Sequence, residues 1–241
     1  MKCVLLAAGY ATRLYPLTEN TPKALLKLGK KTILDMVVDK IEEVKEIDQI
    51  YIVTNHKFYI SFSDWAQNHG GNIKVLNDFT TSNDNRLGAI GDLKYVIDKE
   101  SIDDELLVMA SDNIFDFSLD EMVKLYREKN ADVICVNKVE SESEIKQMGV
   151  AQIAEDGKVI GFEEKPENPK SDLGAAPFYL YHRDTVRMIE EYLKEGNNPD
   201  APGNFIPWLA KKKPVYAYVT EKMRIDIGTP ETYEAAQKLF S

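Results

Sequence analysis

The chain has 241 residues, 44% of them hydrophobic, which is ordinary for one α/β domain with a large core. Its formal net charge of −10, with no basic stripe to offset it, argues against a protein that binds nucleic acid. No apolar run reaches the roughly 18 residues of a membrane span, so no membrane-spanning helix is expected.

The two cysteines indicate a reducing compartment. Cys3 and Cys135 both lie inside apolar, strand-like runs, and their spacing suggests no metal site. We expect both to be small buried hydrophobes. The apolar run after Met1 is too short for a signal peptide and soon meets Arg13, so we expect a soluble, cytoplasmic protein.

The first expected element is a buried strand over residues 2–8, which ends in a turn of small residues at Gly9. Arg13 and Lys23 follow within one short loop. Small side chains let backbone amides approach a phosphate, and nearby cations balance its charge. The sequence therefore predicts a triphosphate site at the end of the first strand.

Other interpretations of this segment are weaker. The dinucleotide fingerprint needs further glycines, but Ala11 and Leu14 stand at those positions. The run Gly29-Lys30-Lys31-Thr32 has the end of a P-loop without its upstream glycine, because residue 24 is Ala. A purely structural interpretation remains, in which a buried edge of a sheet is followed by two solvated basic residues.

The first half of the chain alternates strands and helices. A helix is expected after residue 32, with Thr32 and Asp35 as a capping box, and a later one begins at Ser118 with Glu121. The other expected elements are strands over 49–54, 72–76 and 105–110, a helix over 88–98, and the Ser118 helix running to about 129. Such alternation favours right-handed crossovers and a mainly parallel sheet.

The second half contains more strands. The expected elements are strands over 131–139, 150–153, 159–163, 177–181, 215–219 and 223–227, and helices over 184–194, about 205–211 and from 230 onward. No linker interrupts the chain. The expected fold class is α/β, a Rossmann-like, mixed and mainly parallel sheet flanked by helices. We expect one domain, 1–241, with a nucleotide-binding lobe over about 1–130 and a strand-rich, sugar-binding lobe over about 131–241.

Two carboxylates lie at the ends of expected strands. Asp112 follows the strand over 105–110, and Asp226 lies in the last expected strand, before Gly228-Thr229-Pro230. Ligands of parallel sheets bind beyond the carboxyl ends of the strands, so Asp112 and the Gly9 loop are expected to face one cleft. Magnesium prefers one or two carboxylates with phosphate oxygens and water. Either aspartate alone could instead cap a neighbouring helix.

The first loop resembles the signature of the sugar nucleotidyltransferases, also called NDP-sugar pyrophosphorylases. The matching residues are Leu5-Leu6-Ala7-Ala8-Gly9-Tyr10-Ala11-Thr12-Arg13-Leu14, Pro16-Leu17-Thr18 and Pro22-Lys23. Segments Gly161-Phe162-Glu163-Glu164-Lys165-Pro166 and Asp226-Ile227-Gly228-Thr229-Pro230 also resemble family motifs. The resemblance covers almost the whole chain and is to the shorter members of the family.

This resemblance implies roles for individual residues. It implies nucleotide binding by Leu6, Ala7, Ala8, Gly9, Arg13, Lys23 and Gly88. It implies sugar-phosphate binding by Gly149, Glu164 and Lys165, with catalytic roles for Arg13, Lys23 and Lys165. In the family the matching aspartates, here Asp112 and Asp226, hold Mg²⁺ on the triphosphate.

Some positions depart from the family pattern. Ser111 stands where Gly is usual, and Ala176-Pro177 replaces a segment in which Gly often precedes the aromatics. In the loop over 83–89 only Gly88 can be matched to a base-contacting residue. The nucleobase and the sugar are therefore open, with UTP, dTTP and CTP as the candidates.

The reaction implied is transfer of NMP from an NTP to a sugar 1-phosphate, with release of pyrophosphate. NTP and sugar 1-phosphate are the implied partners, Mg²⁺ is the implied cofactor, and a homo-oligomer is compatible with the sequence. Three alternatives remain: a cytidylyltransferase for a non-sugar phosphate such as phosphocholine, a glycosyltransferase, and a nucleotide-sugar sensor without catalysis. The next Asp after Asp112 is Asp116, so the D-x-D motif typical of glycosyltransferases is missing.

Overall fold

The computed structural model describes residues 1–240. Within them nine strands form one sheet in the order β10-β9-β11-β6-β1-β4-β5, with β8 paired to β11 and β12 paired to β8. The sheet is parallel from β6 to its edge strand β5. Strand β1 (Lys2–Leu6) lies between β4 (Gln49–Thr54) and β6 (Leu106–Ala110), and β4 pairs with β5 (Ile73–Asn77). The apolar runs of the first half thus form the parallel strands that their alternation with helices predicts.

The second half adds mostly antiparallel strands. Strand β11 (Leu173–Tyr181) runs antiparallel to both β6 and β8 (Asp132–Lys138), and it joins the two halves into one sheet. The remaining strands are β9 (Gly149–Ile153), β10 (Val159–Glu164) and β12 (Val215–Thr220), of which only β12 pairs parallel, with β8. The fold class expected from the sequence is confirmed.

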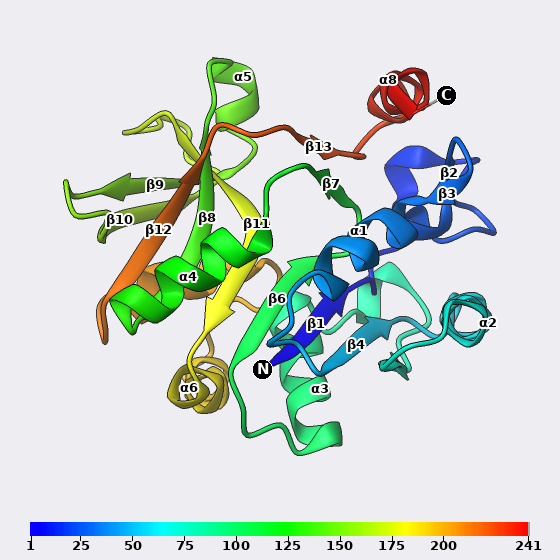
Figure 1. Cartoon of the computed structure of the whole chain (residues 1–241), viewed down its shortest axis with the longest axis horizontal. Coiled ribbons are helices and arrows are strands. Elements are labelled where there is room, and N and C mark those ends of the chain that lie inside the picture. The colour runs from blue at the N-terminus through cyan, green and yellow to red at the C-terminus, as the bar shows by residue number, and fades with distance from the viewer. Residues whose placement is uncertain (241) are drawn as a thin grey trace.

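Helices cover both faces of the sheet (Figure 1). One core contains Cys3 and Leu5 and is covered by α1 (Ile33–Glu42), α2 (Tyr59–His69), α4 (Leu119–Lys129) and α8 (Pro230–Phe240). The other contains Val4 and is covered by α3 (Ala89–Glu100), α6 (Arg183–Lys194) and α7 (Phe205–Ala210). Successive residues of β1 therefore face opposite cores, as the alternation of side chains along a strand requires.

The two predicted helix starts are only partly as expected. At α1 the capping box is present, since the Asp35 N–H donates to Thr32 Oγ1 at 3.0 Å and the Thr32 N–H to Asp35 Oδ2 at 2.7 Å. At α4 the Ser118 hydroxyl accepts from the Asp120 N–H at 3.3 Å. Glu121 does not return to the cap, because its carboxylate accepts a hydrogen bond from the Tyr218 hydroxyl at 2.6 Å.

Several elements are absent from the sequence prediction. Helix α2 was missed because its sequence buries only Phe62 fully and shows no apolar stripe. Strands β7 (Asn113–Phe115) and β13 (Arg224–Asp226) pair with each other away from the main sheet, and β7 was not expected. The other short elements are η1 (Thr12–Leu14), η2 (Lys23–Leu25), β2 (Lys27–Leu28), β3 (Lys31–Thr32), η3 (Asn83–Asn85), α5 (Glu142–Ile145) and η4 (Pro202–Asn204).

The start of β11 also differs from the expectation. The strand begins at Leu173, four residues before Pro177, and its register against β8 shifts between Ala176 and Tyr179. Proline cannot donate a ladder hydrogen bond, so a central strand accommodates it at such an irregularity. Among residues 1–240, no helix combines the length and apolar character needed to cross a bilayer.

Candidate functional site

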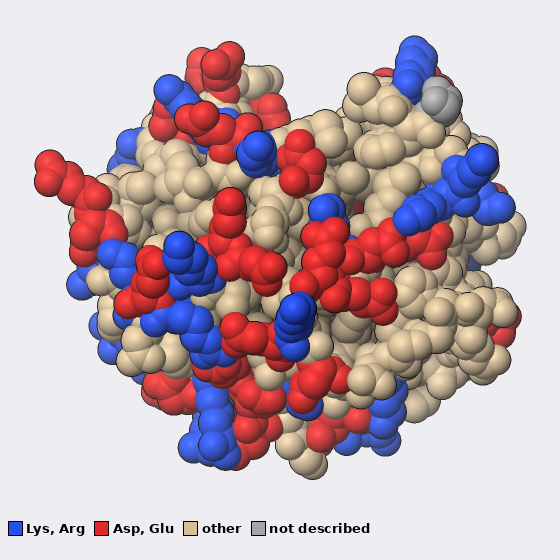
Figure 2. Space-filling model, viewed as in Figure 1, with Lys and Arg blue, Asp and Glu red and all other residues tan. Residues whose placement is uncertain are grey.

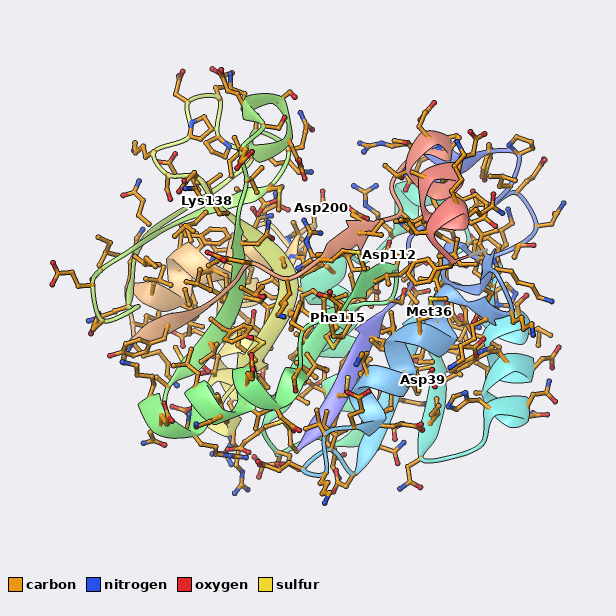
Figure 3. All side chains as sticks on the ribbon, turned by 45° about the horizontal axis from the view of Figure 1, so that its top comes forward. Met36, Asp39, Asp112, Phe115, Lys138 and Asp200 are labelled. Atoms are coloured by element: carbon orange, nitrogen blue, oxygen red, sulfur yellow. The ribbon has the colours of Figure 1, made fainter. Side chains whose placement is uncertain are left out.

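A cavity of about 560 Å³ lies beyond the carboxyl ends of β1 and β6. It is lined by most residues of the predicted nucleotide and metal sets: Leu6, Ala8, Gly9, Arg13, Lys23, Gly88, Asp112 and Asp226. Ala7 lines a smaller adjoining hollow with Lys23 and Asp112. The molecule is hollowed at this edge (Figure 2), and in Figure 3 Asp112 and Asp200 lie between helix α8 and the part that carries Lys138. The expected meeting of the first loop with Asp112 is therefore observed.

The loop after β1 is held in place by buried polar side chains. The Thr18 hydroxyl donates to the carbonyl of Ala11 at 2.7 Å, and Ala11 has a left-handed backbone with φ of 46°. Thr54, the last residue of β4, donates to the Ala7 carbonyl at 3.2 Å, and Asn55, which follows it, donates to the Ala8 carbonyl at 2.9 Å. These three side chains are fully buried and fix the loop that faces the cavity.

Gly9 provides open space beside the backbone and does not adopt a positive φ angle. A Cβ atom built at Gly9 would meet no atom within 4 Å, and Gly9 is not among the residues with positive φ. The open space beside this residue therefore belongs to the cavity, where a side chain would project.

One lysine links the two aspartates. Lys23 Nζ lies 2.6 Å from Asp112 Oδ2 and 3.6 Å from Asp226 Oδ1. The antiparallel pairing of β7 with β13 sets Asp226 opposite Asn113, which brings the two distant segments together. Partial removal from water and the nearby Asp112 carboxylate raise the pKa of Asp226, and Lys23 opposes this. The group is a compact acidic pair balanced by a single lysine.

The donor set fits Mg²⁺ bound together with phosphate. In the part of the chain that the structure describes, no cluster of three or more His, Cys, Asp or Glu side chains could enclose a metal by itself. Two carboxylates that leave the remaining positions to phosphate oxygens and water are what Mg²⁺ commonly takes. Asp112 and Asp226 are the residues that would hold it.

Gly88 is required by its surroundings. It precedes α3 with φ of 79°, and a Cβ there would lie 2.7 Å from the Pro199 carbonyl oxygen. That carbonyl accepts from the Ile90 N–H at 2.9 Å, and the Asp200 carboxylate pairs with Arg86 at 3.2 Å. Only glycine tolerates this angle and this contact without strain. The segment around Asp200 thus closes one wall of the cavity.

A buried acidic pair beside the cavity escaped the sequence prediction. Asp92 on α3 is 6% exposed, lines the cavity, and has one carboxyl oxygen without a hydrogen-bond partner within residues 1–240. Burial, then the charge of Asp78 and a hydrogen bond with it, raise the pKa of Asp92 to about 8. Asp78 accepts hydrogen bonds from the Thr80 N–H and hydroxyl at 2.7 and 2.8 Å. Asp92 is therefore the protonated member of the pair at neutral pH.

Replacing Asp92 with Asn is expected to stabilise the protein increasingly as the pH rises. Folded Asp92 keeps a proton that the unfolded chain releases above its ordinary pKa of 3.8, so wild-type stability falls between about pH 4 and pH 8. Asn has no such proton, so its advantage over wild type should grow by about 1.4 kcal/mol for each pH unit across this interval. Urea unfolding at pH 5 and pH 8 measures this. Asp84→Asn, at an exposed position, is the control, and an Asp92→Asn advantage that does not change with pH would contradict the assignment.

The three residues predicted to bind the acceptor lie beyond this cavity. Gly149 and Glu164 face each other across β9 and β10, and a Cβ at Gly149 would lie 2.9 Å from Glu164 Oε2. Burial raises the pKa of Glu164. Lys165 follows with φ of 48°, is exposed, and its N–H donates to the Met148 carbonyl at 3.0 Å. None of the three lines the cavity. Pro177 does line it, and Pro177 belongs to β11, the strand that pairs with β9.

Comparison with known proteins points to one family. The family model described as nucleotidyl transferase matches residues 2–241. Among curated relatives, a bifunctional protein GlmU of Methanocaldococcus jannaschii is 30% identical over 95% of this chain and 52% of its own length. The UTP–glucose-1-phosphate uridylyltransferase AglF of Haloferax volcanii is 26% identical over 99% of this chain and 96% of its own.

Solved structures share the fold. A putative glucose-1-phosphate thymidylyltransferase from Bacillus anthracis superposes with a TM-score of 0.83 at 24% identity, covering 99% of this chain and 94% of its own. A UDP-glucose pyrophosphorylase complexed with UDP-glucose gives a TM-score of 0.84 at 21% identity, covering 99% and 97%. The chain spans about half of the first curated relative and 64% of another, a UTP–glucose-1-phosphate uridylyltransferase of Synechocystis.

Proposed function

The chain belongs to the nucleotidyl transferase family, and on this premise we propose that it transfers NMP from an NTP to a sugar 1-phosphate, releasing pyrophosphate. UTP, dTTP and CTP are the proposed donors. The observation that carries the proposal is the convergence of Arg13, Lys23, Asp112 and Asp226 on one cavity. We assign the nucleotide to the lobe over about 1–130 and the acceptor to the lobe over about 131–241.

In the proposed reaction an acceptor phosphate oxygen attacks the α-phosphorus of the NTP. The bond from that phosphorus to the oxygen bridging to the β-phosphate breaks, and its electron pair leaves with pyrophosphate. A phosphate monoester is already anionic near neutral pH, so no general base is needed. The difficulty is to bring two anions together, which orientation and fixed positive charge can overcome.

We propose that each positively charged side chain binds a different phosphate group. Arg13 is exposed at the cavity and forms no ion pair within residues 1–240, so it is free to bind the departing pyrophosphate. Lys23, held by the two aspartates, contacts the triphosphate, and Lys165 contacts the acceptor phosphate. Mg²⁺, held by Asp112 and Asp226, would supply further positive charge for the triphosphate.

Pyrophosphate release over a grid of NTPs and acceptors with Mg²⁺ tests the proposal. The grid includes glucose 1-phosphate, other sugar 1-phosphates, phosphocholine and ribitol phosphate. A strong signal for one NTP with one sugar 1-phosphate supports the proposal, whereas turnover of phosphocholine alone would replace it. NTP binding without turnover of any acceptor would favour the sensor. Lys165→Ala should lower the signal, and Lys170→Ala, an exposed lysine paired with Glu163, is the matched control.

A second test concerns the predicted role of Glu164. A Cβ built at Gly203 would lie 1.9 Å from Glu164 Oε2, so Gly203→Ala must displace this carboxylate. We propose that an acceptor hydroxyl donates a hydrogen bond to the Glu164 carboxylate, and losing such a bond to a charged group costs about 1.5–3 kcal/mol. KM for the acceptor should therefore rise about tenfold or more, with KM for the NTP unchanged. If the alanine acts through Glu164, its effect should not add to that of Glu164→Gln in the double variant. Additive effects would contradict this role.

A further inference from the structure

Arg224 lies between the cavity and the three residues predicted to bind the acceptor, Gly149, Glu164 and Lys165. It lies two residues before Asp226 on β13, so the two side chains leave the strand on the same side. Its Nη1 donates to Asn113 Oδ1 at 2.6 Å, and Asn113 lines the cavity. Its Nη2 lies 4.0 Å from the sulfur of Met148, on the acceptor side.

Met148 places Arg224 near the predicted acceptor residues. The carbonyl of Met148 accepts the N–H of Lys165 at 3.0 Å, and Gly149 follows it directly. Its side chain is confined as well, because a Cβ at Gly174 would lie 2.8 Å from the terminal methyl of Met148. One residue therefore contacts both the Arg224 side chain and the Lys165 backbone.

The guanidinium of the half-buried Arg224 is only partly supplied with hydrogen-bond partners. In residues 1–240 no carboxylate forms an ion pair with it, and its Nε is buried without a hydrogen-bond acceptor. Leaving a buried donor unpaired is costly, and the cost is greater for a charged group. Asn113 and the weakly accepting Met148 sulfur are neutral. The nearby Asp226 carboxylate interacts with the charge of Arg224 but forms no ion pair with it within residues 1–240, so no carboxylate fills the fork of the guanidinium.

Resting on the proposed function, we infer that Arg224 binds the phosphate of the acceptor and orients it toward the α-phosphorus. The planar fork of an arginine matches two phosphate oxygens at once, which a lysine cannot do. The attacking phosphate must come close to a triphosphate held near Asp112 and Asp226. Arg224 lies two residues from Asp226 on β13 and donates to Asn113, which directly follows Asp112. Lys165 reaches the same phosphate from β10.

Three variants test this assignment. Arg224→Met removes the charge and keeps the length, Arg224→Lys keeps the charge without the fork, and Lys222→Met removes an exposed charge two residues away. We expect Arg224→Met to raise KM for the acceptor at least about tenfold with KM for the NTP changed less than about twofold. Arg224→Lys should raise KM for the acceptor less than Arg224→Met does, and Lys222→Met should leave this KM at the wild-type value. Thermal unfolding of each variant confirms folding, and Arg224→Lys remains the test if Arg224→Met does not fold.

Direct binding separates this inference from the proposed function. Titration of glucose 1-phosphate and of inorganic phosphate into the full chain, without NTP, should show about tenfold weaker binding to Arg224→Met than to wild type. Equal affinities, or a KM increase shared equally by NTP and acceptor, would overturn the role of Arg224. A loss confined to acceptors with a second anionic group would also overturn it. If no NTP and acceptor pair releases pyrophosphate with wild type, the proposed function fails, while the phosphate titration still decides on Arg224.

Discussion

Replacing Asp112 with Asn is expected to lower kcat by about 10²–10³-fold, the range seen when one charged or hydrogen-bonding group that stabilises a transition state is removed. Asp112 contacts Lys23 at 2.6 Å and is one of the two carboxylates that would hold Mg²⁺. Asn keeps the size of the side chain but removes its charge, so both the lysine and the metal lose a partner. The measurement is single-turnover pyrophosphate release at saturating substrates.

Asp116→Asn is the matched control for this experiment. Asp116 is the next aspartate along the chain, is exposed, and does not line the cavity. It should retain wild-type turnover. Asp112→Asn should also retain nearly wild-type thermal stability, because the Lys23 pair is partly solvated and contributes little to folding. Near-full turnover by Asp112→Asn would show that the metal and lysine are held by other residues.

Replacing Phe178 with Ala is expected to destabilise the fold by about 3–5 kcal/mol. Phe178 is fully buried in β11, and its ring lies 4.8 Å from that of Phe115 and 5.2 Å from that of Phe117, both in edge-to-face contact. The change removes this aromatic contact and leaves a cavity between β11 and the chain around β7. For a chain of this size the midpoint of thermal unfolding should fall by about 10 °C.

Ile160→Ala provides the comparison for stability. Ile160 is 66% exposed on β10, so its truncation should change the free energy of unfolding by less than about 0.5 kcal/mol. Chemical denaturation of both variants separates loss of packing from a general effect of truncation. A loss below about 1 kcal/mol for Phe178→Ala would mean that the surrounding rings close the cavity.

Much of the fold could be predicted because local and global signals agree. The capping box of Thr32 and Asp35 and the apolar strand runs are local patterns that the structure confirms. The approach of the Gly9 loop to Asp112 follows from the rule that ligands bind at the carboxyl ends of parallel strands. Ser111, the departure from the usual Gly, is 4% exposed and its N–H donates to the Leu6 carbonyl at 3.3 Å, so serine is accommodated in this turn.

The features that escaped prediction depend on contacts between distant segments. Asp92 lies in the first turns of a helix, where an acidic residue is usually exposed and favoured by the helix dipole. Only the packing of α3 against the chain after β5 brings it to Asp78. Arg224 is one of several charged residues near the end of the chain, and only the pairing of β13 with β7 sets it beside Asn113. No local periodicity encodes these contacts.

The β7–β13 pair also determines when the site can form during synthesis. The ribosome releases the Gly9 loop and the parallel strands early, but Asp226 and Arg224 emerge only after β12. Contacts between such distant parts of a chain carry a high entropic cost and generally form late in folding. A nascent chain that has reached β12 therefore has the Gly9 loop and Asp112 without Asp226. We expect it to be catalytically silent until its last strand docks.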